Sequence, residues 1–418
     1  MNIEEITAQE AKDLEFLKQF TSTPGNGCTR LPFTKEARGA VDYLRSIMEE
    51  AGLEVHEDVV GNVIGVLKGT DPTLPCVMMG SHYDSVTNGG DFDGIAGVIC
   101  GIQVARLLKE KGFTPKRNFV VVGFVDEEGL RFGTGYFGSA SIVGDQDEPR
   151  DVKYCKTYKD NDGISYYEAM KSYGLDPERI HEARWADGAI DKFIELHIEQ
   201  GPVLDTEKIQ LGLVEGIVGI QRYVVTVNGR ADHAGTTPMD MRLDAVDAAT
   251  KVISKIADWA REKADGTVST VGRITTIPGG MNIVAEKCEF TVDIRSMNND
   301  NINDIANRMR SALDREVKEM GGSYEIDHKL TITPVMMSKE MLGIMEESCK
   351  EHEFSYKYLP SGAGHDALQI ANQGISTVML FVPSKDGRSH CPVEFTKYSD
   401  FARGTVVMSE LAENLLSK

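Results

Sequence analysis

The sequence predicts an α/β fold whose first domain is interrupted by an α+β unit. Between residues 34 and 125, strand-like runs alternate with helical segments, and two of the runs are continuously apolar, as in strands covered on both faces. From about residue 212 to residue 330, the strand-like runs instead alternate apolar and polar residues, which is typical of a sheet with one free face. A length of 418 residues allows two or three domains, and this pattern favours two.

The first domain begins with a predicted helix over residues 34–51. Its apolar residues recur at helical spacing, and Gly52 follows as a C-terminal cap. Because the next segments are rich in β-branched residues or periodic at 3.6 residues, further elements can be assigned in chain order. They are strand 63–67, strand 76–79, helix 95–111 and strand 118–125.

The middle of the chain predicts the interrupting unit, and the first domain resumes after it. Strands are expected where apolar and polar residues alternate, and helices where apolar residues form a stripe. The elements expected in the middle are strands 223–227 and 290–294 and helices 245–262 and 303–320. A helix over 339–351 and a buried strand over 377–382 follow them.

Composition excludes several partners. The 45 Lys and Arg against 65 Asp and Glu give 45 − 65 = −20, a charge that repels phosphate backbones and anionic lipids, so neither nucleic acid nor membrane is expected. The apolar run 95–108 contains Gln103 and Arg106 and is too short to cross a bilayer. Seven cysteines without a C-x-x-C pair, and an acidic N-terminus unlike a secretory signal, predict a cytoplasmic location.

Polar residues follow the predicted strand 76–79, in Gly-Ser-His-Tyr-Asp and then in Gly-Gly-Asp-Phe-Asp-Gly. In an extended segment residues i and i+2 face the same way, so His82 and Asp84 can converge while the Gly-rich turn returns Asp93 to them. The imidazole would bind a metal ion and the carboxylate would orient it. A surface histidine beside a capping aspartate is the alternative for an isolated His-x-Asp, and the Gly-Gly-x-x-Asp-Gly continuation weakens it.

The predicted strand 118–125 ends in three consecutive carboxylates, Asp126, Glu127 and Glu128. Adjacent carboxylates repel one another unless a cation or solvent screens them. With a metal ion present, one glutamate could bind the ion while its neighbour takes a proton from a water molecule that the ion acidifies. A solvated acidic loop is the alternative for an acidic run by itself.

Two further histidines complete a ligand set. Residues 195–199 alternate polar and apolar, which places Glu195, His197 and Glu199 on one face of a strand. His390 lies in a turn that follows the strand 377–382. Either histidine alone would more often be structural, but all four candidate segments leave strand ends of one expected sheet.

These segments together resemble the M20-type metallohydrolases, and specifically the hydantoinase/carbamoylase branch of N-carbamoyl-L-amino acid hydrolases, β-ureidopropionases and allantoate amidohydrolases. The resemblance covers nearly the whole chain and includes Asp-Glu-Glu-Gly, Leu-His-Ile-Glu-Gln-Gly, Asp-His-Ala-Gly-Thr-Thr-Pro and Ser-His-Cys-Pro. His197, where many peptidase relatives have an acidic ligand, favours this branch. The resemblance implies a metal-binding catalytic domain (1–212 and 331–418) with a mixed, largely parallel sheet flanked by helices, and an inserted α+β lid and dimerisation domain (213–330).

The resemblance also implies two divalent metal ions per subunit, bridged by Asp93. The other ligands would be His82 and His197 at one ion, and Glu128 and His390 at the other. Glu127 would be the general base, and Asp84 would orient an imidazole ligand. Because nitrogen and oxygen ligands suit Zn, Mn, Co and Ni, the identity of the metal stays open.

In the inserted domain, the resemblance makes His233 the residue that reaches the neighbouring subunit's site and stabilises the developing oxyanion, so a homodimer would be required. Arg295 matches the anchor of the substrate carboxylate. Further matches to substrate-contacting residues are Gln200, Asn282 and His365. The loop after Asn282 departs from many relatives, which have a Pro-Gly turn in place of Ala285-Glu286. Without the resemblance, Arg295 would be a solvated strand charge and His233 a loop residue.

The activity implied is hydrolysis of the ureido C–N bond of an N-carbamoyl-L-amino acid to the amino acid, ammonia and carbon dioxide. Allantoate amidohydrolase is the alternative, because allantoate presents the same carboxylate and ureido group. An aminopeptidase or dipeptidase of the wider superfamily, and a noncatalytic binding protein that retains the fold, are further alternatives. A site divided between two domains would also require the lid to open and close.

Overall fold

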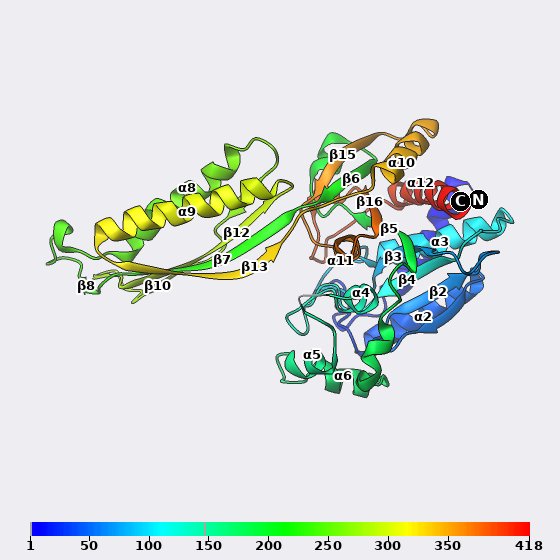
Figure 1. The fold of residues 1–418 in the computed structure, drawn as a ribbon, viewed down its shortest axis with the longest axis horizontal. Helices are drawn as coiled ribbons and strands as arrows, with labels where there is room; N and C mark the ends of the chain where they lie inside the picture. Colours follow the sequence, from blue (N-terminus) through cyan, green and yellow to red (C-terminus); the bar gives the residue numbers. More distant parts are fainter. Residues whose placement is uncertain (1, 146–147) are drawn as a thin grey trace. The chain divides into compact units, whose positions relative to one another are not determined.

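The computed structural model describes residues 2–145 and 148–418, which form two compact units (Figure 1). The first unit contains the chain up to Glu215, then Met337–Leu359 and Ala363–Lys418. The second unit contains Gly216–Met336 and Pro360–Gly362. The chain therefore leaves the first unit after residue 215 and re-enters it at residue 337. The sequence predicted an inserted domain over residues 213–330, so these boundaries lie three and six residues later in the chain.

The first unit is built on a mixed sheet. Its strands lie in the order β1 (Glu54–Glu57), β2 (Val63–Leu67), β4 (Phe119–Phe124), β3 (Cys76–His82), β5 (Ile190–Ile198), β16 (Ser376–Val382) and β6 (Leu211–Ile217), and β15 (Tyr356–Ser361) also pairs with β6. The four central strands β4, β3, β5 and β16 are parallel, whereas β1, β2 and β6 pair antiparallel with their neighbours. The predicted mixed sheet flanked by helices is confirmed, with its parallel part confined to the four central strands.

Helices cover this sheet. The longer helices are α1 (Ile3–Leu17), α2 (Lys35–Glu50), α3 (Ile95–Glu110), α10 (Lys339–Glu351) and α12 (Tyr398–Leu416). The shorter helices are α4 (Phe137–Val143), α5 (Val152–Thr157), α6 (Tyr166–Tyr173), α7 (Val203–Glu207) and α11 (Asp366–Asn372). Two 3-10 turns, η1 (Pro177–Ala183) and η3 (Lys385–Gly387), also belong to this unit. Helix α2 starts where Thr34 accepts the N–H of Ala37, as an N-cap should. Helix α3 packs on β3 and is buried along nearly its whole length, which explains why its sequence is apolar apart from Gln103, Arg106 and its last two residues.

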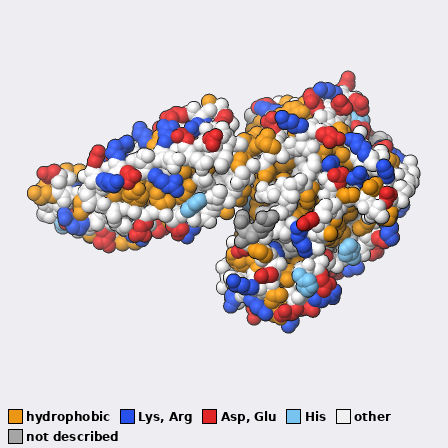
Figure 2. All heavy atoms as spheres, viewed as in Figure 1, with side chains coloured by type: hydrophobic (Ala, Val, Ile, Leu, Met, Phe, Trp, Pro, Cys, Tyr) orange, Lys and Arg blue, Asp and Glu red, His pale blue; other side chains and the backbone are white. Residues whose placement is uncertain are grey.

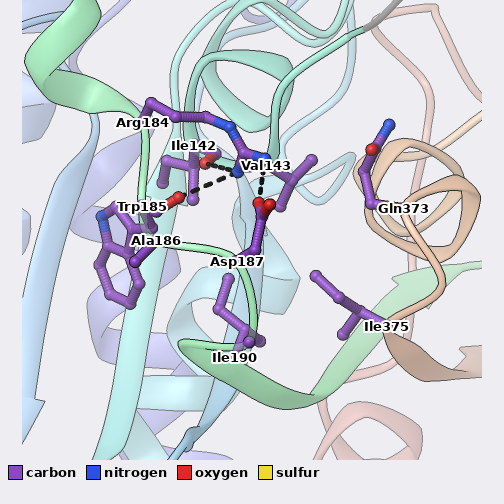
Figure 3. Close-up of a pocket in the computed structure, with 10 residues that line it drawn as sticks. Ile142, Val143, Arg184, Trp185, Ala186, Asp187, Ile190, Gln373 and Ile375 are labelled. Carbon is purple, nitrogen blue, oxygen red and sulfur yellow. Dashed lines mark hydrogen bonds and ion pairs between the residues drawn. The ribbon is translucent and has the colours of Figure 1, made fainter.

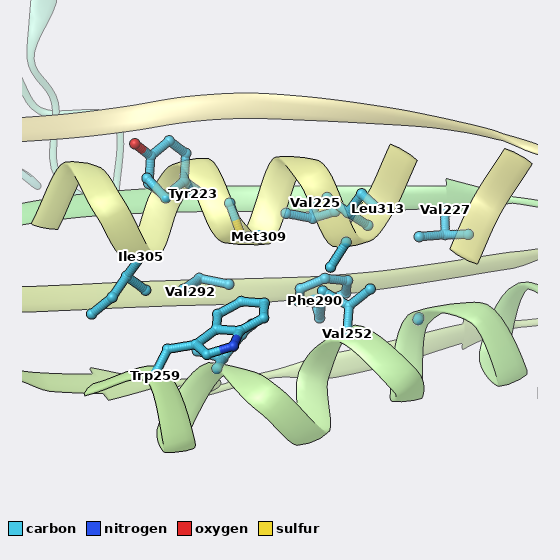
Figure 4. Close-up of a cluster of buried hydrophobic side chains, with 14 of the residues drawn as sticks. Tyr223, Val225, Val227, Val252, Trp259, Phe290, Val292, Ile305, Met309 and Leu313 are labelled. Atoms are coloured by element: carbon cyan, nitrogen blue, oxygen red, sulfur yellow. The ribbon is translucent and has the colours of Figure 1, made fainter. Parts of the chain in front are cut away.

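The second unit is an antiparallel sheet covered on one face by two helices (Figure 4). The strands are β10 (Ile274–Ile277), β12 (Lys287–Ser296), β7 (Gly219–Asn228) and β13 (Ser323–Ile332), with β9 (Val268–Thr270) beside β12; the helices are α8 (Ala245–Arg261) and α9 (Asn299–Met320). Alternate residues of β12 are buried, and Phe290 packs in the core with Val225, Trp259 and Met309. The alternating pattern in the sequence therefore marks a sheet with one covered face.

Three short strands and a 3-10 turn complete the second unit. Strands β8 (Asp232–His233) and β11 (Ile283–Val284) pair with each other, and β14 (Val335–Met336) pairs with the end of β6. A 3-10 turn, η2 (Met239–Met241), lies between β8 and α8. The β8–β11 pair brings two loops that are distant in sequence next to each other.

The face of the molecule in Figure 2 carries charges of both signs and hydrophobic side chains among them. Figure 2 shows acidic side chains scattered among basic ones over the face in view. Among the described residues, none of the helices combines the length and the apolar character that a membrane crossing needs.

Candidate metal centre and active site

The candidate residues of the first unit meet at one edge of its sheet. Because β4, β3, β5 and β16 are parallel, their carboxyl ends lie at the same edge, where ligands of α/β sheets bind. His82 is the last residue of β3, and His197 lies one residue before the end of β5. The predicted strand 76–79 is thus three residues too short. The loops after β4 and β16 supply the remaining groups.

Asp93 stands between two groups of ligand atoms. Its Oδ1 lies 3.2 Å from Nε2 of His197 and 4.0 Å from Nε2 of His82, and its Oδ2 lies 3.1 Å from Nε2 of His390. Glu128 belongs to the second group, since its Oε1 is 3.4 Å from the same His390 nitrogen. One carboxylate is therefore shared by two three-residue groups, each with a spacing that could hold a cation.

Backbone carbonyls fix the orientation of two imidazoles. Nδ1 of His82 donates to the carbonyl oxygen of Asp84 at 3.1 Å, and Nδ1 of His197 donates to that of Ile198 at 2.9 Å. With the proton assigned to Nδ1 from these partners, Nε2 of each ring keeps a free lone pair on the side of Asp93. Both rings are buried, so neither can turn to solvent.

Asp84 connects the histidine ligand to the carboxylate loop. Its Oδ1 lies 3.6 Å from Nδ1 of His82 and accepts the N–H of Glu127 at 3.1 Å, while its Oδ2 accepts the N–H of Glu128 at 3.3 Å. The preceding residue, Asp126, has φ +56°, a left-handed conformation that is costly for a side chain larger than glycine. The strained turn and the Asp84 contacts together fix the direction in which both glutamates leave the strand.

Glu127 lies beside the first group, with its Oε2 3.9 Å from Nε2 of His82. Burial, followed by the charges of Glu128 and Asp366, raises the pKa of Glu127 well above its usual range. Burial and the charge of Asp93 likewise raise the pKa of Glu128 to about 8. These carboxylates repel one another in a space from which water is largely excluded.

Asp93 behaves differently, because the histidines surround it. Burial raises the pKa of the Asp93 carboxyl, but the adjacent imidazoles of His197, His390 and His82 outweigh burial and hold this pKa well below the usual range. In turn, Asp93 raises the pKa of His390 to about 9, and it also outweighs the effect of burial to raise that of His197 to about 9. A positive charge is thus favoured on both sides of Asp93.

These groups fit divalent cations. Nε2 of His197 is buried and makes no hydrogen bond of acceptable geometry within the described part of the chain, although Asp93 Oδ1 is near it. A cation between these atoms would satisfy the orphaned nitrogen and relieve the repulsion among the carboxylates. Imidazole nitrogen and carboxylate oxygen are donors that suit Zn, Mn, Co and Ni.

Gln200 and His365 lie at the same centre. Gln200, with φ +55°, donates from Nε2 to Asp93 Oδ2 at 3.0 Å and to Oδ1 at 3.2 Å. The buried ring of His365 lies 4.4 Å from that of His197, centroid to centroid. The structure therefore brings together all the predicted site residues of the first unit, namely His82, Asp84, Asp93, Glu127, Glu128, His197, Gln200, His365 and His390.

The other three predicted residues lie in the second unit. His233 pairs with Ile283 across β8 and β11, and the N–H of Ala234 donates to the carbonyl oxygen of Asn282 at 3.0 Å, so His233 and Asn282 are neighbours. Nδ1 of His233 accepts the N–H groups of Gly235 and Thr236 at 3.0 and 3.2 Å, which leaves the proton on the exposed Nε2.

Arg295 lies on β12, and not in the paired loops that contain His233 and Asn282. Its Nε and Nη2 donate to Asp293 at 2.8 and 3.2 Å, and its Nη1 donates to the carbonyl oxygen of Gly362 at 2.7 Å. Three of its five N–H groups are engaged in this way, and two remain for a ligand.

Sequence reasoning missed two carboxylates that support the centre. Glu195 is fully buried and accepts the hydroxyl of Ser81 at 2.6 Å and the N–H of Ala367 at 2.9 Å, so it joins β3, β5 and the start of α11. The alternation of polar and apolar residues over 195–199, which places Glu195 on the same strand face as His197, was the sequence pattern that could have identified it. Glu394, four residues after His390, is buried against the loop of Asp93. A buried glutamate after a histidine turn carries no signal in a single sequence.

A cavity of about 340 Å³ lies elsewhere in the first unit (Figure 3). It is lined by Ile190 at the start of β5 and by Trp185. Arg184, which also lines it, donates to the carbonyl oxygens of Ile142 and Trp185 and pairs with Asp187. Because Ile190 and His197 mark opposite ends of β5, this cavity lies away from the metal-ligating groups.

Known proteins share this arrangement of sequence and fold. The sequence profile of Peptidase family M20/M25/M40 matches residues 78–414. The chain is 39% identical over 404 residues to an N-carbamoyl-L-amino-acid amidohydrolase from Paenarthrobacter aurescens, covering 97% of each chain. It is 36% identical over 396 residues to an allantoate amidohydrolase from Escherichia coli (strain K12), covering 95% of each. Among solved structures, a hydantoinase/carbamoylase family amidase from Burkholderia multivorans superposes with TM-score 0.90 at 28% identity, over 99% of this chain and 98% of the other.

Proposed function

The chain belongs to Peptidase family M20/M25/M40, and on this premise we propose that it hydrolyses the ureido C–N bond of an N-carbamoyl-L-amino acid. The products are the free amino acid, ammonia and carbon dioxide. Hydrolases of this family are metal-dependent. One observation carries the proposal, namely that the two oxygens of Asp93 face two separate ligand groups, at 3.2 Å from His197 and 3.1 Å from His390.

We propose that these groups hold two divalent ions per subunit, chosen from Zn, Mn, Co and Ni. Asp93 would bridge them, His82 and His197 would complete one site, and Glu128 and His390 the other. Such a pair, when bound, polarises the scissile carbonyl and lowers the pKa of water toward neutrality. A ureido group is poorly electrophilic, so its hydrolysis requires both effects.

Glu127 acts as the general base in this proposal. It takes a proton from the attacking water and passes it to the leaving nitrogen. Asp84 holds the backbone N–H groups of Glu127 and Glu128 and faces Nδ1 of His82, so it orients both the base and a ligand. The water supplies the hydroxyl of a carbamic acid, which decomposes to carbon dioxide and ammonia.

The second unit supplies substrate contacts in this proposal. Arg295 retains two free N–H groups for the substrate carboxylate. His233 donates from Nε2 to the developing oxyanion of the neighbouring subunit's site, and the acceptance of two backbone N–H groups by its Nδ1 supports that tautomer. Gln200, Asn282 and His365 contact the rest of the substrate. The enzyme is accordingly a homodimer whose second unit acts as lid and dimerisation domain.

Allantoate is the second candidate substrate, and the 36% identity to the Escherichia coli allantoate amidohydrolase is the observation that supports it as an alternative. Allantoate carries the same carboxylate and ureido group, so the same residues would bind it. We further propose a cytoplasmic location, because all seven cysteines are free thiols, as expected in a reducing compartment.

An ammonia-release screen tests the proposal. Apoprotein reloaded with Zn, Mn, Co or Ni is incubated with N-carbamoyl-L-amino acids, allantoate, ureidoglycolate, β-ureidopropionate and free dipeptides, with Glu127→Gln as the inactive control. Turnover of N-carbamoyl-L-amino acids above all others is the expected result. Preference for allantoate supports the second candidate. Turnover of dipeptides alone, or of none of these compounds, overturns both.

A further inference from the structure

Glu394 joins the two loops that carry Asp93 and His390. Its side chain is buried, and its Oε1 accepts the backbone N–H groups of Phe92 and Asp93 at 3.0 and 3.1 Å. Its Oε2 accepts the hydroxyl of Ser389 at 2.8 Å. One carboxylate thus fixes the backbone of Asp93 and the residue that precedes His390.

The Asp93 loop is shaped around this carboxylate. A Cβ atom at Gly90 would lie 2.0 Å from Oε1 of Glu394 and 2.1 Å from its carboxyl carbon. No side chain fits there, so only glycine lets the loop approach closely enough for both N–H groups to reach Oε1. The contact is therefore built into the loop and does not result from a chance rotamer.

Ser389 has one hydroxyl hydrogen and two carboxylate acceptors. Its Oγ lies 2.8 Å from Oε2 of Glu394 and 3.2 Å from Oδ2 of Asp93. The shorter distance gives the hydrogen to Glu394. Oδ2 is also the oxygen of Asp93 that faces His390 at 3.1 Å and accepts Nε2 of Gln200 at 3.0 Å. Since a carboxylate oxygen has two lone pairs, a hydroxyl that also donated to Oδ2 would occupy the one left for a cation.

We propose that Glu394 is a positioning residue that directs the Ser389 hydroxyl away from Oδ2 of Asp93 and so keeps this oxygen available to the cation held with Glu128 and His390. The two backbone N–H groups anchor Glu394 so that its second oxygen always faces Ser389. This inference rests on the proposed dinuclear centre, because it concerns the oxygen that would bridge to the second ion.

Glu394→Gln tests the proposal by reversing one hydrogen bond. The amide oxygen of glutamine would still accept from Phe92 and Asp93, but its NH2 group would donate to Ser389 Oγ. The serine hydrogen would then turn to Asp93 Oδ2 and compete with the cation. We expect the affinity for the more weakly held of the two ions to fall about 10-fold to 100-fold. The measurement is titration of chelator-treated protein with Co²⁺ or Zn²⁺ against a chromophoric chelator.

Removing the hydroxyl should rescue this loss. In Glu394→Gln/Ser389→Ala no hydrogen can turn to Asp93, so the affinity should return to within about 3-fold of the wild-type value. A loss of cation affinity that the double variant does not rescue would mean that Glu394 only supports the loop, and it would overturn the proposal. Glu410→Gln is the matched control, since Glu410 also accepts a serine hydroxyl, that of Ser348, outside the centre.

Two further outcomes separate this inference from the proposed function. If the wild-type protein binds no divalent ions, the proposed function fails. If the wild-type protein binds two ions and Glu394→Gln binds them equally well, only the role of Glu394 fails. If Glu394→Gln does not fold, Ser389→Ala tests the inference instead. This variant keeps Glu394 and has no hydroxyl, so its cation affinity should equal that of the wild type. A loss of about 10-fold or more would overturn the inference.

Discussion

Replacing Glu10 with glutamine should make the protein progressively more stable than the wild type as the pH rises. Glu10 lies on α1 and is fully buried against α12. Its Oε1 accepts the hydroxyl of Thr405 at 2.5 Å, whereas its Oε2 is buried without a hydrogen-bond partner among the described residues. A carboxylate in this position would leave half of its charge unpaired, so the native state favours the neutral acid.

The size of the effect follows from proton linkage. Burial raises the pKa of Glu10 well above 4.5, with the Asp13 charge adding to it and with Thr405 and Arg106 acting in the opposite direction. Above pH 4.5 the unfolded chain has lost this proton and the native state keeps it. The free energy of unfolding therefore falls with pH by about 1.4 kcal/mol per pH unit until the native pKa is reached. Glutamine does not titrate, so the variant lacks this loss.

Urea unfolding of chelator-treated protein at pH 5.5 and 6.5 measures the effect. The stability of Glu10→Gln minus that of the wild type should be larger at pH 6.5 than at pH 5.5, by at most about 1.4 kcal/mol. Glu4→Gln is the control, because Glu4 is exposed on the same helix. A difference that stays constant or shrinks as the pH rises would refute the assignment of a neutral buried carboxyl.

The remaining predictions concern the active site. Asp84→Asn should weaken metal binding about 10-fold to 100-fold, because its NH2 group would face a backbone N–H; unchanged affinity in a metal titration would contradict this. Glu127→Gln should keep both ions by metal analysis and lower kcat about 10²-fold to 10⁴-fold. Mixing Glu127→Gln subunits with His233→Ala subunits should restore about a quarter of the activity if each His233 serves its partner's site, and no recovery would refute that role. Arg295→Lys should raise KM for carboxylate substrates more than it lowers kcat, since lysine cannot bind a carboxylate through two parallel N–H groups. An uncharged N-carbamoyl amine should not distinguish Arg295→Lys from the wild type.

Predictions from the sequence succeeded where one face of an element is buried and the other is solvated. Helix α10 has the predicted bounds Lys339–Glu351, and α2 differs by one residue at each end. Helices α1 and α12 were missed for physical reasons. In α1 the core-facing positions include Glu10 and Asp13, and α12 is buried on almost every side, so neither sequence shows an apolar stripe.

The candidate site was predictable to the extent that strand ends determine it. His82 ends β3 and Glu128 follows β4, and because these strands are parallel neighbours, both residues lie at the same edge of the sheet. The family resemblance inferred from these motifs is confirmed. Glu394 could not be found in this way, because it reaches the backbone of Phe92 across 302 residues of chain. Contacts between a side chain and a distant loop depend on the packed structure and leave no local pattern.

The order of the parallel strands also has a consequence for biosynthesis. The strand that precedes His390, β16, joins the sheet beside β5 only after the chain has passed through the whole second unit. During translation the ribosome therefore releases His82, Asp93, Glu128 and His197 long before the last ligand emerges. A nascent chain that ends before β16 can offer the groups His82, Asp93 and His197 or His82, Glu127 and Glu128, but it lacks the group that includes His390. If the centre holds two ions as proposed, the ion held with His390 can bind only when synthesis is nearly complete, so a chain truncated before β16 should lack that ion and remain inactive.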